Sequence, residues 1–239
     1  MNSPPLDSLV LGLIRELTPF VKVKLLIPDS FNKPAIEARL VKEGMNMSRI
    51  TFLVTNPPGA PTDPSPVFLI NGKSELATVD FKWNGYGLDL NKKSKHTLRG
   101  EKFDVEMALK LGMPVLSKSD LVWEGGAKEY NSKGTMLLVE QLELQRNPDG
   151  QKNKIEKEHI NKLNLSKVIW LKKGTWEDEF QVRLPGGYYP IGTGGHIDEF
   201  CRFANDSTIM LAEVSALERD SDSIHAENYK KGWRKTLLF

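Results

Sequence analysis

The chain has 239 residues, of which 39% are hydrophobic and 27% charged, an ordinary composition for a globular protein that can bury a sizeable core. Its 33 Lys and Arg nearly balance its 31 Asp and Glu, and the formal net charge of +2 gives no reason to expect nucleic acid or a membrane surface as a partner. No stretch approaches the roughly 18–20 apolar residues that span a bilayer, and no basic region precedes the short apolar stretch 9–14 as in a secretory signal.

Hydrophobic periodicity predicts helices and strands from the first residues onward. Apolar residues at helical spacing predict a helix over 6–20, and an alternating stretch predicts a strand over 21–27. A second helix is expected over 33–43 and a second strand over 50–54. The segment 55–66 contains five prolines, a density that no regular element tolerates, so we expect a loop there.

The rest of the chain alternates short strands with single helices. Strands are expected over 67–70, 76–81, 115–122, 135–139, 167–171, 196–203 and 208–214, and helices over 103–111, 155–163 and 228–238. The polar stretch 91–101 suits a solvated loop or a helix start, and 174–195 suits a long loop. The order of elements indicates an α/β fold, but not the strict βαβα rhythm of a doubly wound sheet. A helix followed by two or three strands recurs loosely, which suggests a radial repeat of small sheets.

The stretch Gly194–Phe200 contains the most informative pair of polar residues. If it opens a strand, His196 and Asp198 point to the same side, because side chains alternate along a strand. Histidine titrates near neutrality and can shuttle protons, and a neighbouring carboxylate can hold a cation or tune the ring. A structurally bonded histidine in a glycine loop is the plainer alternative. A metal site would need a third ligand at useful spacing, which this stretch does not supply.

Three further residues are candidates for the same site. Glu124 ends an apolar strand beside Gly125 and Gly126, a place where catalytic groups often lie, although a solvated turn explains it equally well. Asp63 lies in the proline-rich turn before the strand 67–70, where an aspartate needs no special explanation. Trp83 belongs to the aromatic and glycine run Phe81–Gly87, which either lines a pocket or packs in the core.

Taken together, the order and spacing of these stretches resemble the agmatine deiminase and bacterial peptidylarginine deiminase family. The stretches that carry the resemblance are Asp63–Ile70, Val79–Gly87, Leu121–Pro148, Val168–Leu171 and Gly192–Val214. The resemblance implies a propeller-like, pseudo-fivefold ring of ββαβ units (a pentein), here an incomplete ring with an open edge. It also implies deimination by a cysteine thiolate, without a metal or an organic cofactor.

The resemblance assigns a role to each candidate residue. His196 would be the general acid and base, and Glu124 would orient and polarise it. Asp198 and Asp63 would bind the guanidinium group, which is planar and rich in hydrogen-bond donors, and Trp83 would line the substrate pocket. The stretch 60–66 departs from the family pattern, because it lacks the Trp, Arg and Gly that usually surround the first aspartate.

A second departure concerns the nucleophile. Cys201 is the only cysteine, and it lies three residues after Asp198, where the family does not place its nucleophile. On an alternating strand it would face away from His196 and Asp198, so we expect a buried, apolar-like cysteine. A single cysteine forms no internal disulfide, which fits a reducing, cytoplasmic location. We therefore expect residues 1–239 to be one truncated deiminase domain without the segment that carries the nucleophile.

The predicted function is hydrolysis of a guanidinium group to a ureido group and ammonia. The substrate would be agmatine, which links the activity to putrescine and polyamine biosynthesis, or an arginine side chain of a peptide. The alternatives are an inactive guanidinium-binding protein and a non-functional fragment. We expect no nucleic acid or membrane partner, and homo-oligomer formation stays open.

Overall fold

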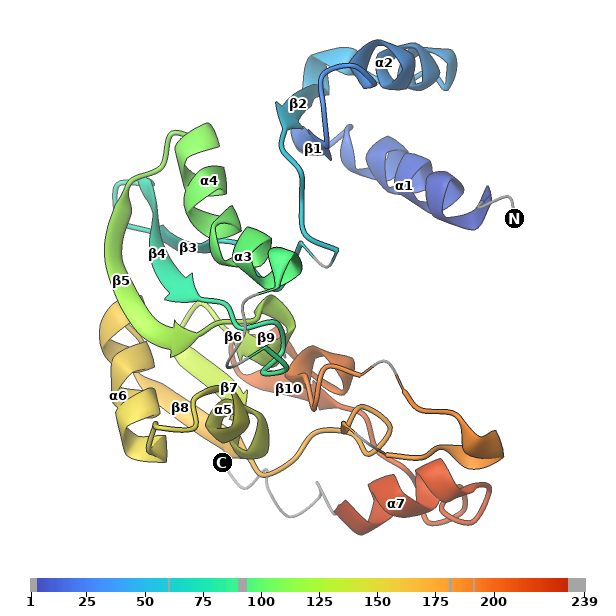
Figure 1. Cartoon of the computed structure of the whole chain (residues 1–239), viewed down its shortest axis with the longest axis vertical. Helices are drawn as coiled ribbons and strands as arrows, with labels where there is room; N and C mark the ends of the chain where they lie inside the picture. Colours follow the sequence, from blue (N-terminus) through green and yellow to red (C-terminus); the bar gives the residue numbers. More distant parts are fainter. Residues whose placement is uncertain (1–3, 60, 90–93, 181, 191, 232–239) are drawn as a thin grey trace. The chain divides into compact units, whose positions relative to one another are not determined.

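A computed structural model describes most of the chain (Figure 1). The described residues are 4–59, 61–89, 94–180, 182–190 and 192–231. The chain divides into two compact units, Met1–Gly59 and Ala60–Phe239, and buried apolar clusters occur within each of them. No helix in the described part of the chain is long and apolar enough to cross a bilayer.

The first unit is a βαβ arrangement preceded by a helix. Its elements are α1 (Pro4–Leu17), β1 (Val23–Ile27), α2 (Lys33–Lys42), the 3-10 turn η1 (Met47–Arg49) and β2 (Ile50–Val54). β1 and β2 pair in parallel, with Val23 opposite Ile50. Ile14, Leu40, Met45 and Ile50 form the buried core between these elements. The four predicted helices and strands of this unit are confirmed, with their ends shifted by a few residues.

Two three-stranded sheets of the second unit share one topology. In the first, β3 (Val67–Ile70) and β4 (Leu76–Lys82) form an antiparallel hairpin, and β5 (Val115–Val122) returns parallel to β4 after α3 (Lys95–Glu101) and α4 (Phe103–Lys110). In the second, β6 (Lys128–Tyr130) and β7 (Thr135–Val139) form the hairpin, and β8 (Lys167–Leu171) returns parallel to β7 after α5 (Glu140–Arg146) and α6 (Lys152–Leu163). Both sheets are therefore ββαβ units.

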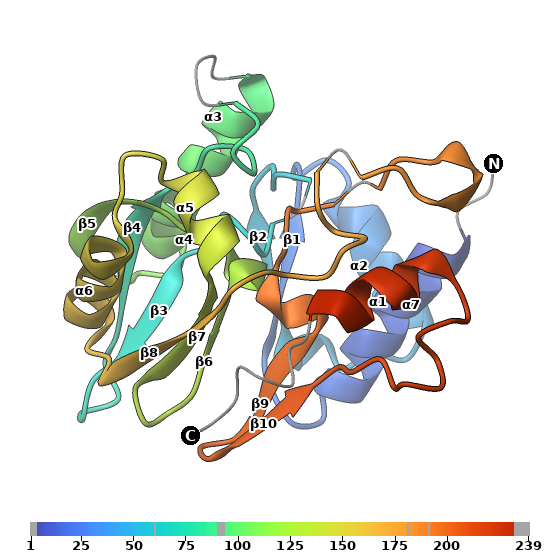
Figure 2. The same ribbon diagram turned by 90° about the horizontal axis from the view of Figure 1, so that it is seen from below.

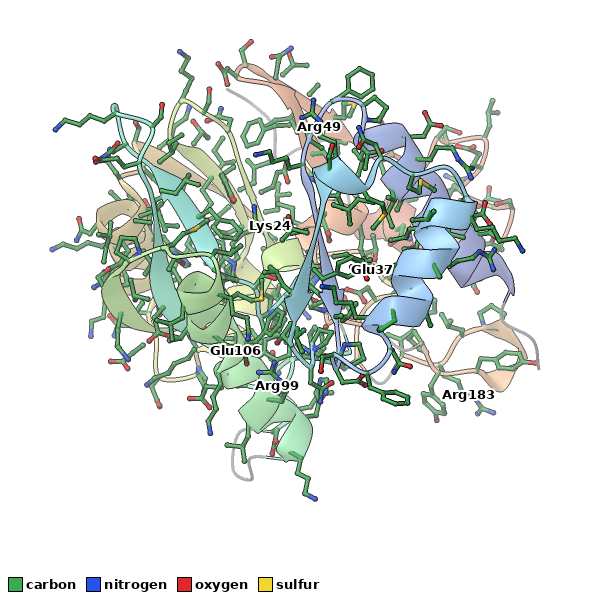
Figure 3. The ribbon with its side chains drawn as sticks, turned by 90° about the horizontal axis from the view of Figure 1, so that it is seen from above. Lys24, Glu37, Arg49, Arg99, Glu106 and Arg183 are labelled. Carbon is green, nitrogen blue, oxygen red and sulfur yellow. The ribbon has the colours of Figure 1, made fainter. Side chains whose placement is uncertain are left out.

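Helix α6 packs against both sheets, and an ion pair joins α3 to α4. α6 contacts both β5 and β8, and so joins the two sheets (Figures 1 and 2). Arg99 of α3 and Glu106 of α4 form an ion pair of 2.8 Å, and both side chains are labelled in Figure 3. The third part of the unit is an antiparallel hairpin of β9 (Cys201–Asn205) and β10 (Thr208–Leu211), followed by α7 (Ser223–Lys231) (Figure 2). Among the described residues, the strands form no closed sheet.

Strand β7 is the centre of the second unit because both of its faces are buried. Met136 and Leu138 pack in one apolar cluster with residues of β3, β4 and β5. Leu137 and Val139 point the other way, into a cluster that includes residues of β8 and β9. All four side chains are fully buried, and full burial of a side chain of this size stabilises a fold by roughly 1.5–3 kcal/mol. β7 therefore contributes side chains to both apolar clusters of the second unit.

Several predictions of local structure are wrong or incomplete. The strand predicted over 196–203 begins only at Cys201, because Ile197–Glu199 forms the 3-10 turn η4. The helix predicted over 228–238 begins at Ser223, and its residues 232–238 lie outside the described residues. Most of the polar stretch 91–101 is α3, capped by Ser94, while 91–93 lie outside the described residues. The short elements β6 and α5 were not predicted at all.

Candidate active site

Glu124 lies just after β5 and is fully buried. It leads into the 3-10 turn η2 (Gly125–Ala127), which turns the chain from the first sheet to the second. Its Oε2 lies 2.7 Å from Nε2 of His196, and its two oxygens also accept hydrogen bonds from the guanidinium of Arg146, one of them at 2.9 Å. Burial alone would raise the pKa of Glu124, but the bonds from His196 and Arg146 hold it below the ordinary value. Glu124 is therefore an ionised carboxylate.

Arg146 contacts the site, although the sequence analysis assigned it no role. It ends α5 and is 1% exposed, and its guanidinium also donates to the backbone oxygen of Thr193 and to Gln145. Its Cζ lies 5.6 Å from the ring centroid of Phe180. A cation at a helix C-terminus is stabilised by the helix dipole. Because it bonds both Glu124 and Thr193, Arg146 ties the end of β5 to the loop that carries His196.

Asp178 holds that loop through hydrogen bonds, and the sequence analysis did not identify it as a site residue. Its carboxylate accepts from the backbone N–H groups of Thr193, Gly195 and His196 at 2.5, 2.6 and 3.1 Å, and from the hydroxyl of Thr193 at 2.6 Å. Gly195 has φ +113°, a conformation that L side chains rarely adopt. The predicted glycine loop is thus folded around a buried acid, and no spacing in the sequence indicated which acid.

Asp63 lies on the opposite side of the His196 ring from Glu124. Its Oδ1 is 3.9 Å from Nδ1 of His196 and accepts from the backbone N–H of Gly126 at 2.9 Å. Its Oδ2 accepts from the hydroxyl of Tyr86 at 2.7 Å. The turn 60–66 lacks the usual flanking residues, yet the structure brings this aspartate to the histidine.

Asp198 approaches the same ring nitrogen. Its Oδ1 lies 4.0 Å from Nδ1 of His196, and its side chain is 37% exposed. Burial raises the pKa of Asp198 above its ordinary value, and the negative charge of Asp63 adds to the rise. His196 and Asp198 lie close together, as expected, but the expected reason was wrong. A 3-10 turn, and not the alternation of a strand, brings them together. A Cβ on Gly126 would lie 2.4 Å from Nδ1 of His196, so only glycine fits beneath the ring.

Tyr86, and not Trp83, is the aromatic residue that contacts the site. The Tyr86 ring lies 6.0 Å from the ring of His196, and burial together with the bond to Asp63 raises the pKa of its hydroxyl, which stays a donor. Its φ of +61° is unusual for an aromatic residue and costs about 1–3 kcal/mol. Trp83 is buried behind it, edge-on at 4.8 Å, with its indole against Gly100.

Comparisons with known proteins identify the family of this chain. The sequence profile of the Porphyromonas-type peptidyl-arginine deiminases matches residues 4–236. The chain belongs to this family. A candidate agmatine deiminase of Streptomyces coelicolor is 34% identical over 151 residues, which cover 62% of this chain and 41% of that protein. One of Latilactobacillus sakei is 29% identical over 169 residues, which cover 70% of this chain and 43% of that protein. The chain thus spans less than half the length of either relative.

Solved structures show the same mixed α/β fold as this family member. The agmatine deiminase of Enterococcus faecalis superposes on this chain with a TM-score of 0.73 at 19% identity. The superposed region covers 95% of this chain and 58% of that enzyme. A cysteine-to-serine variant of the C. jejuni agmatine deiminase with substrate bound has a TM-score of 0.72 at 20% identity, and covers 98% of this chain and 63% of its own. At this level of identity the likeness establishes the fold alone.

Cys201 of this deiminase family member is buried, as the sequence predicted. It is 1% exposed and packs among apolar side chains that include Leu137 and Ile197. Burial raises the pKa of the Cys201 thiol to about 11, so the thiolate form is scarce at neutral pH. Cys201 therefore lacks the exposure and the ionisation of a nucleophile.

A cavity of about 450 Å³ lies beside Asp198, within the size range of small-molecule sites. Gly126, Glu129 and Arg202 are among the residues that line it. Nε of Arg202 pairs with Glu129 at 3.1 Å, and its Nη1 lies 4.0 Å from Oδ2 of Asp198. In the described part of the chain, no group of three or more His, Cys, Asp and Glu side chains is arranged to hold a metal ion.

Proposed function

We propose that this chain binds the guanidinium group of agmatine or of a peptide arginine between Asp63 and Asp198, next to Nδ1 of His196. The observation that carries the proposal is the placement of two carboxylates about 4 Å from one histidine nitrogen, with the other nitrogen bonded to Glu124. A guanidinium is a permanent cation whose fork of N–H donors matches carboxylates. Asp198 also borders the cavity, which has room for the aliphatic part of such a substrate.

The reaction we propose for this site is deimination, a hydrolysis of a C–N bond in a linear amidine. A cysteine thiolate adds to the guanidinium carbon, ammonia leaves with a proton from His196, and water then displaces the thiolate to give a ureido product. The thiolate would come from a segment that these 239 residues do not include, and the ββαβ units would continue into a pseudo-fivefold ring. With agmatine as substrate, the product would feed putrescine and polyamine biosynthesis.

A second candidate function is guanidinium binding without turnover. The burial of Cys201, the sole cysteine, favours it for the chain by itself. Binding and turnover differ in what they require, because the two aspartates suffice to hold a cation while hydrolysis needs an accessible nucleophile. Both candidates therefore share one testable feature, the affinity of the aspartate pair for a guanidinium group.

Isothermal titration calorimetry with agmatine, and with a peptide containing one internal arginine, tests this feature. Asp198→Asn should weaken binding by about tenfold or more, because a hydrogen bond to a charged group contributes roughly 1.5–3 kcal/mol. Asp120→Asn is the matched control, since the side chain of Asp120 is 94% exposed on β5. Affinities that are equal in the wild type and in Asp198→Asn would contradict the proposal. The stronger of the two ligands would identify the substrate class.

A further inference from the structure

The hydrogen bond between Glu124 and His196 contains information about where the ring proton lies. Oε2 and Nε2 are 2.7 Å apart, so one of the two atoms must donate. Glu124 also accepts from Arg146 through both of its oxygens. An ionised carboxylate has no hydrogen to give, so it acts only as an acceptor. The hydrogen of this bond therefore belongs to Nε2 of His196.

We propose that Arg146, acting through Glu124, keeps Nδ1 of His196 free of hydrogen, so that the neutral ring offers a bare acceptor nitrogen to an N–H of the guanidinium group that the aspartates would hold. The inference rests on the proposed function, to which it adds a positioning residue. All proton transfers with substrate then pass through Nδ1. The bare nitrogen accepts the proton that the thiol of the nucleophile loses on becoming a thiolate, and the charged ring then donates this proton to the departing amino group, which leaves as ammonia, while Nε2–H stays bonded to Glu124.

The surroundings of Nδ1 fit this assignment. The carboxylates of Asp63 and Asp198 lie 3.9 and 4.0 Å from Nδ1, beyond hydrogen-bond distance, so neither holds a hydrogen on it. Asp63 already accepts from Gly126 and Tyr86. A guanidinium group held by both aspartates would direct an N–H at Nδ1.

Arg146 is the residue that keeps Glu124 from taking up a proton. Glu124 is fully buried, and a buried carboxylate without a cation tends to become neutral. If Arg146 were removed, the pair of Glu124 and His196 would hold one more proton. That proton would either charge the ring or sit on Glu124 and donate to Nε2, which moves the ring hydrogen to the other nitrogen. In both cases Nδ1 would carry a hydrogen.

A second ion pair on the same helix supplies a matched control. Nζ of Lys128 lies 2.5 Å from Oε1 of Glu143, and both side chains are fully buried. This pair joins Lys128, just after η2, to α5, whereas the other pair joins Glu124, just before η2, to α5, with the charges exchanged. Lys128→Met removes the lysine from a buried glutamate, as Arg146→Met removes the arginine, but Glu143 lies beside His159, at 3.7 Å, and is not bonded to His196.

Nitrogen NMR of the histidine rings tests the proposal on the ¹⁵N-labelled chain without ligand. The chain has four histidines, and His196→Gln identifies the signals of this ring. At a pH where the wild-type ring is neutral, we expect hydrogen on Nε2 and none on Nδ1. At the same pH, Arg146→Met should place hydrogen on Nδ1, and Lys128→Met should leave the wild-type pattern.

A neutral wild-type ring with its hydrogen on Nδ1 would overturn the proposal, and this result does not depend on whether Arg146→Met folds. A bare Nδ1 in Arg146→Met, or a protonated Nδ1 in Lys128→Met, would also overturn it. Because no guanidine is added, these results are independent of the calorimetry. Calorimetry could show that agmatine does not bind while NMR shows the proposed tautomer. It could also show binding while NMR shows the other tautomer, so failure of one proposal can be told from failure of the other.

Discussion

The two sides of the His196 ring are built in different ways. On the Nε2 side, Glu124 and Arg146 are at most 1% exposed and are joined by direct hydrogen bonds. On the Nδ1 side, Asp63 and Asp198 stay about 4 Å away, and the side chain of Asp198 is 37% exposed. One side is a closed network of paired charges, and the other has two carboxylates facing a ring nitrogen without a direct bond.

This difference separates groups that support the site from groups that meet a ligand. A paired charge in a fully buried network cannot be removed without leaving its partner unpaired in a medium of low polarity. A partly exposed carboxylate such as Asp198, which accepts no hydrogen bond from the ring, can be neutralised at little cost to the fold. Substitutions on the Nε2 side should therefore lower stability, while substitution of Asp198 on the Nδ1 side should lower binding.

The largest expected effect concerns turnover. The chain alone should release ammonia from agmatine or an arginine peptide about a million-fold more slowly than an enzyme of this type, because loss of a nucleophile has an effect of that order. Cys201→Ser should leave this rate unchanged, since the thiol is buried. An assay for ammonia and ureido product measures both. Clear turnover that Cys201→Ser abolishes would show that the Nδ1 side already has its nucleophile.

The next effect is a loss of stability on the Nε2 side. Arg146→Met should lower the free energy of unfolding by about 3–5 kcal/mol at pH 7, because it leaves a buried carboxylate unpaired. The pKa of Glu124 lies below its ordinary 4.5 in the folded chain, so its stabilising charge is present above that pH and is lost as pH falls through the lowered value. Urea unfolding should show that the difference in free energy of unfolding between Arg146→Met and the wild type becomes smaller below pH 4.5. A difference that becomes larger in acid would contradict the pairing of Glu124 with Arg146.

Gly126→Ala should have an intermediate effect, because the added Cβ would collide with His196. It would lie 2.4 Å from Nδ1 and 2.9 Å from Oδ1 of Asp198, and such overpacking costs about 1–3 kcal/mol. Agmatine affinity should fall as well, since both contacts are on the ligand side. Gly72→Ala is the control in the same unit, as nothing lies within 4 Å of its Cβ position. Equal stability and affinity in the two variants would refute the packing of Gly126 against the ring.

The smallest effect is expected for Asp198→Asn on stability. The folded pKa of Asp198 is raised, so its charge costs stability above the ordinary value of 3.8, and the variant should match or exceed the wild type at pH 7. Because the side chain is partly exposed, the difference should stay below about 1 kcal/mol. It should vanish as pH falls below 3.8, where both chains carry a neutral group. A clear destabilisation in urea would place Asp198 in the closed network instead.

The sequence predicted which residues come together better than it predicted the local structure around them. Glu124 was chosen as a polar residue that ends an apolar strand beside two glycines, and His196 and Asp198 as a pair that follows a glycine loop; all three lie close together in the structure. The strand expected from His196 begins only at Cys201, because the backbone N–H of His196 bonds to Asp178 and the next three residues form the 3-10 turn η4. Alternating residue types cannot reveal a hydrogen bond to an acid that lies far away along the chain.

Residues that act through others were the ones missed. Arg146 is fully buried although arginine is almost never buried without a partner, and its partner precedes it by 22 positions. Tyr86 belongs to the same aromatic and glycine run as Trp83, and its left-handed backbone is not predicted by its residue type. Tertiary pairing, and not local propensity, decides the conformation of these side chains.

The most direct test of the proposed site is a crystal structure of this chain with agmatine. We predict a guanidinium group within hydrogen-bond distance of the carboxylates of Asp63 and Asp198, with an N–H directed at Nδ1 of His196 and the bond from Nε2 to Glu124 unchanged. Agmatine bound elsewhere, or bound with its guanidinium paired to Glu129 in the cavity and Nδ1 uncontacted, would contradict it.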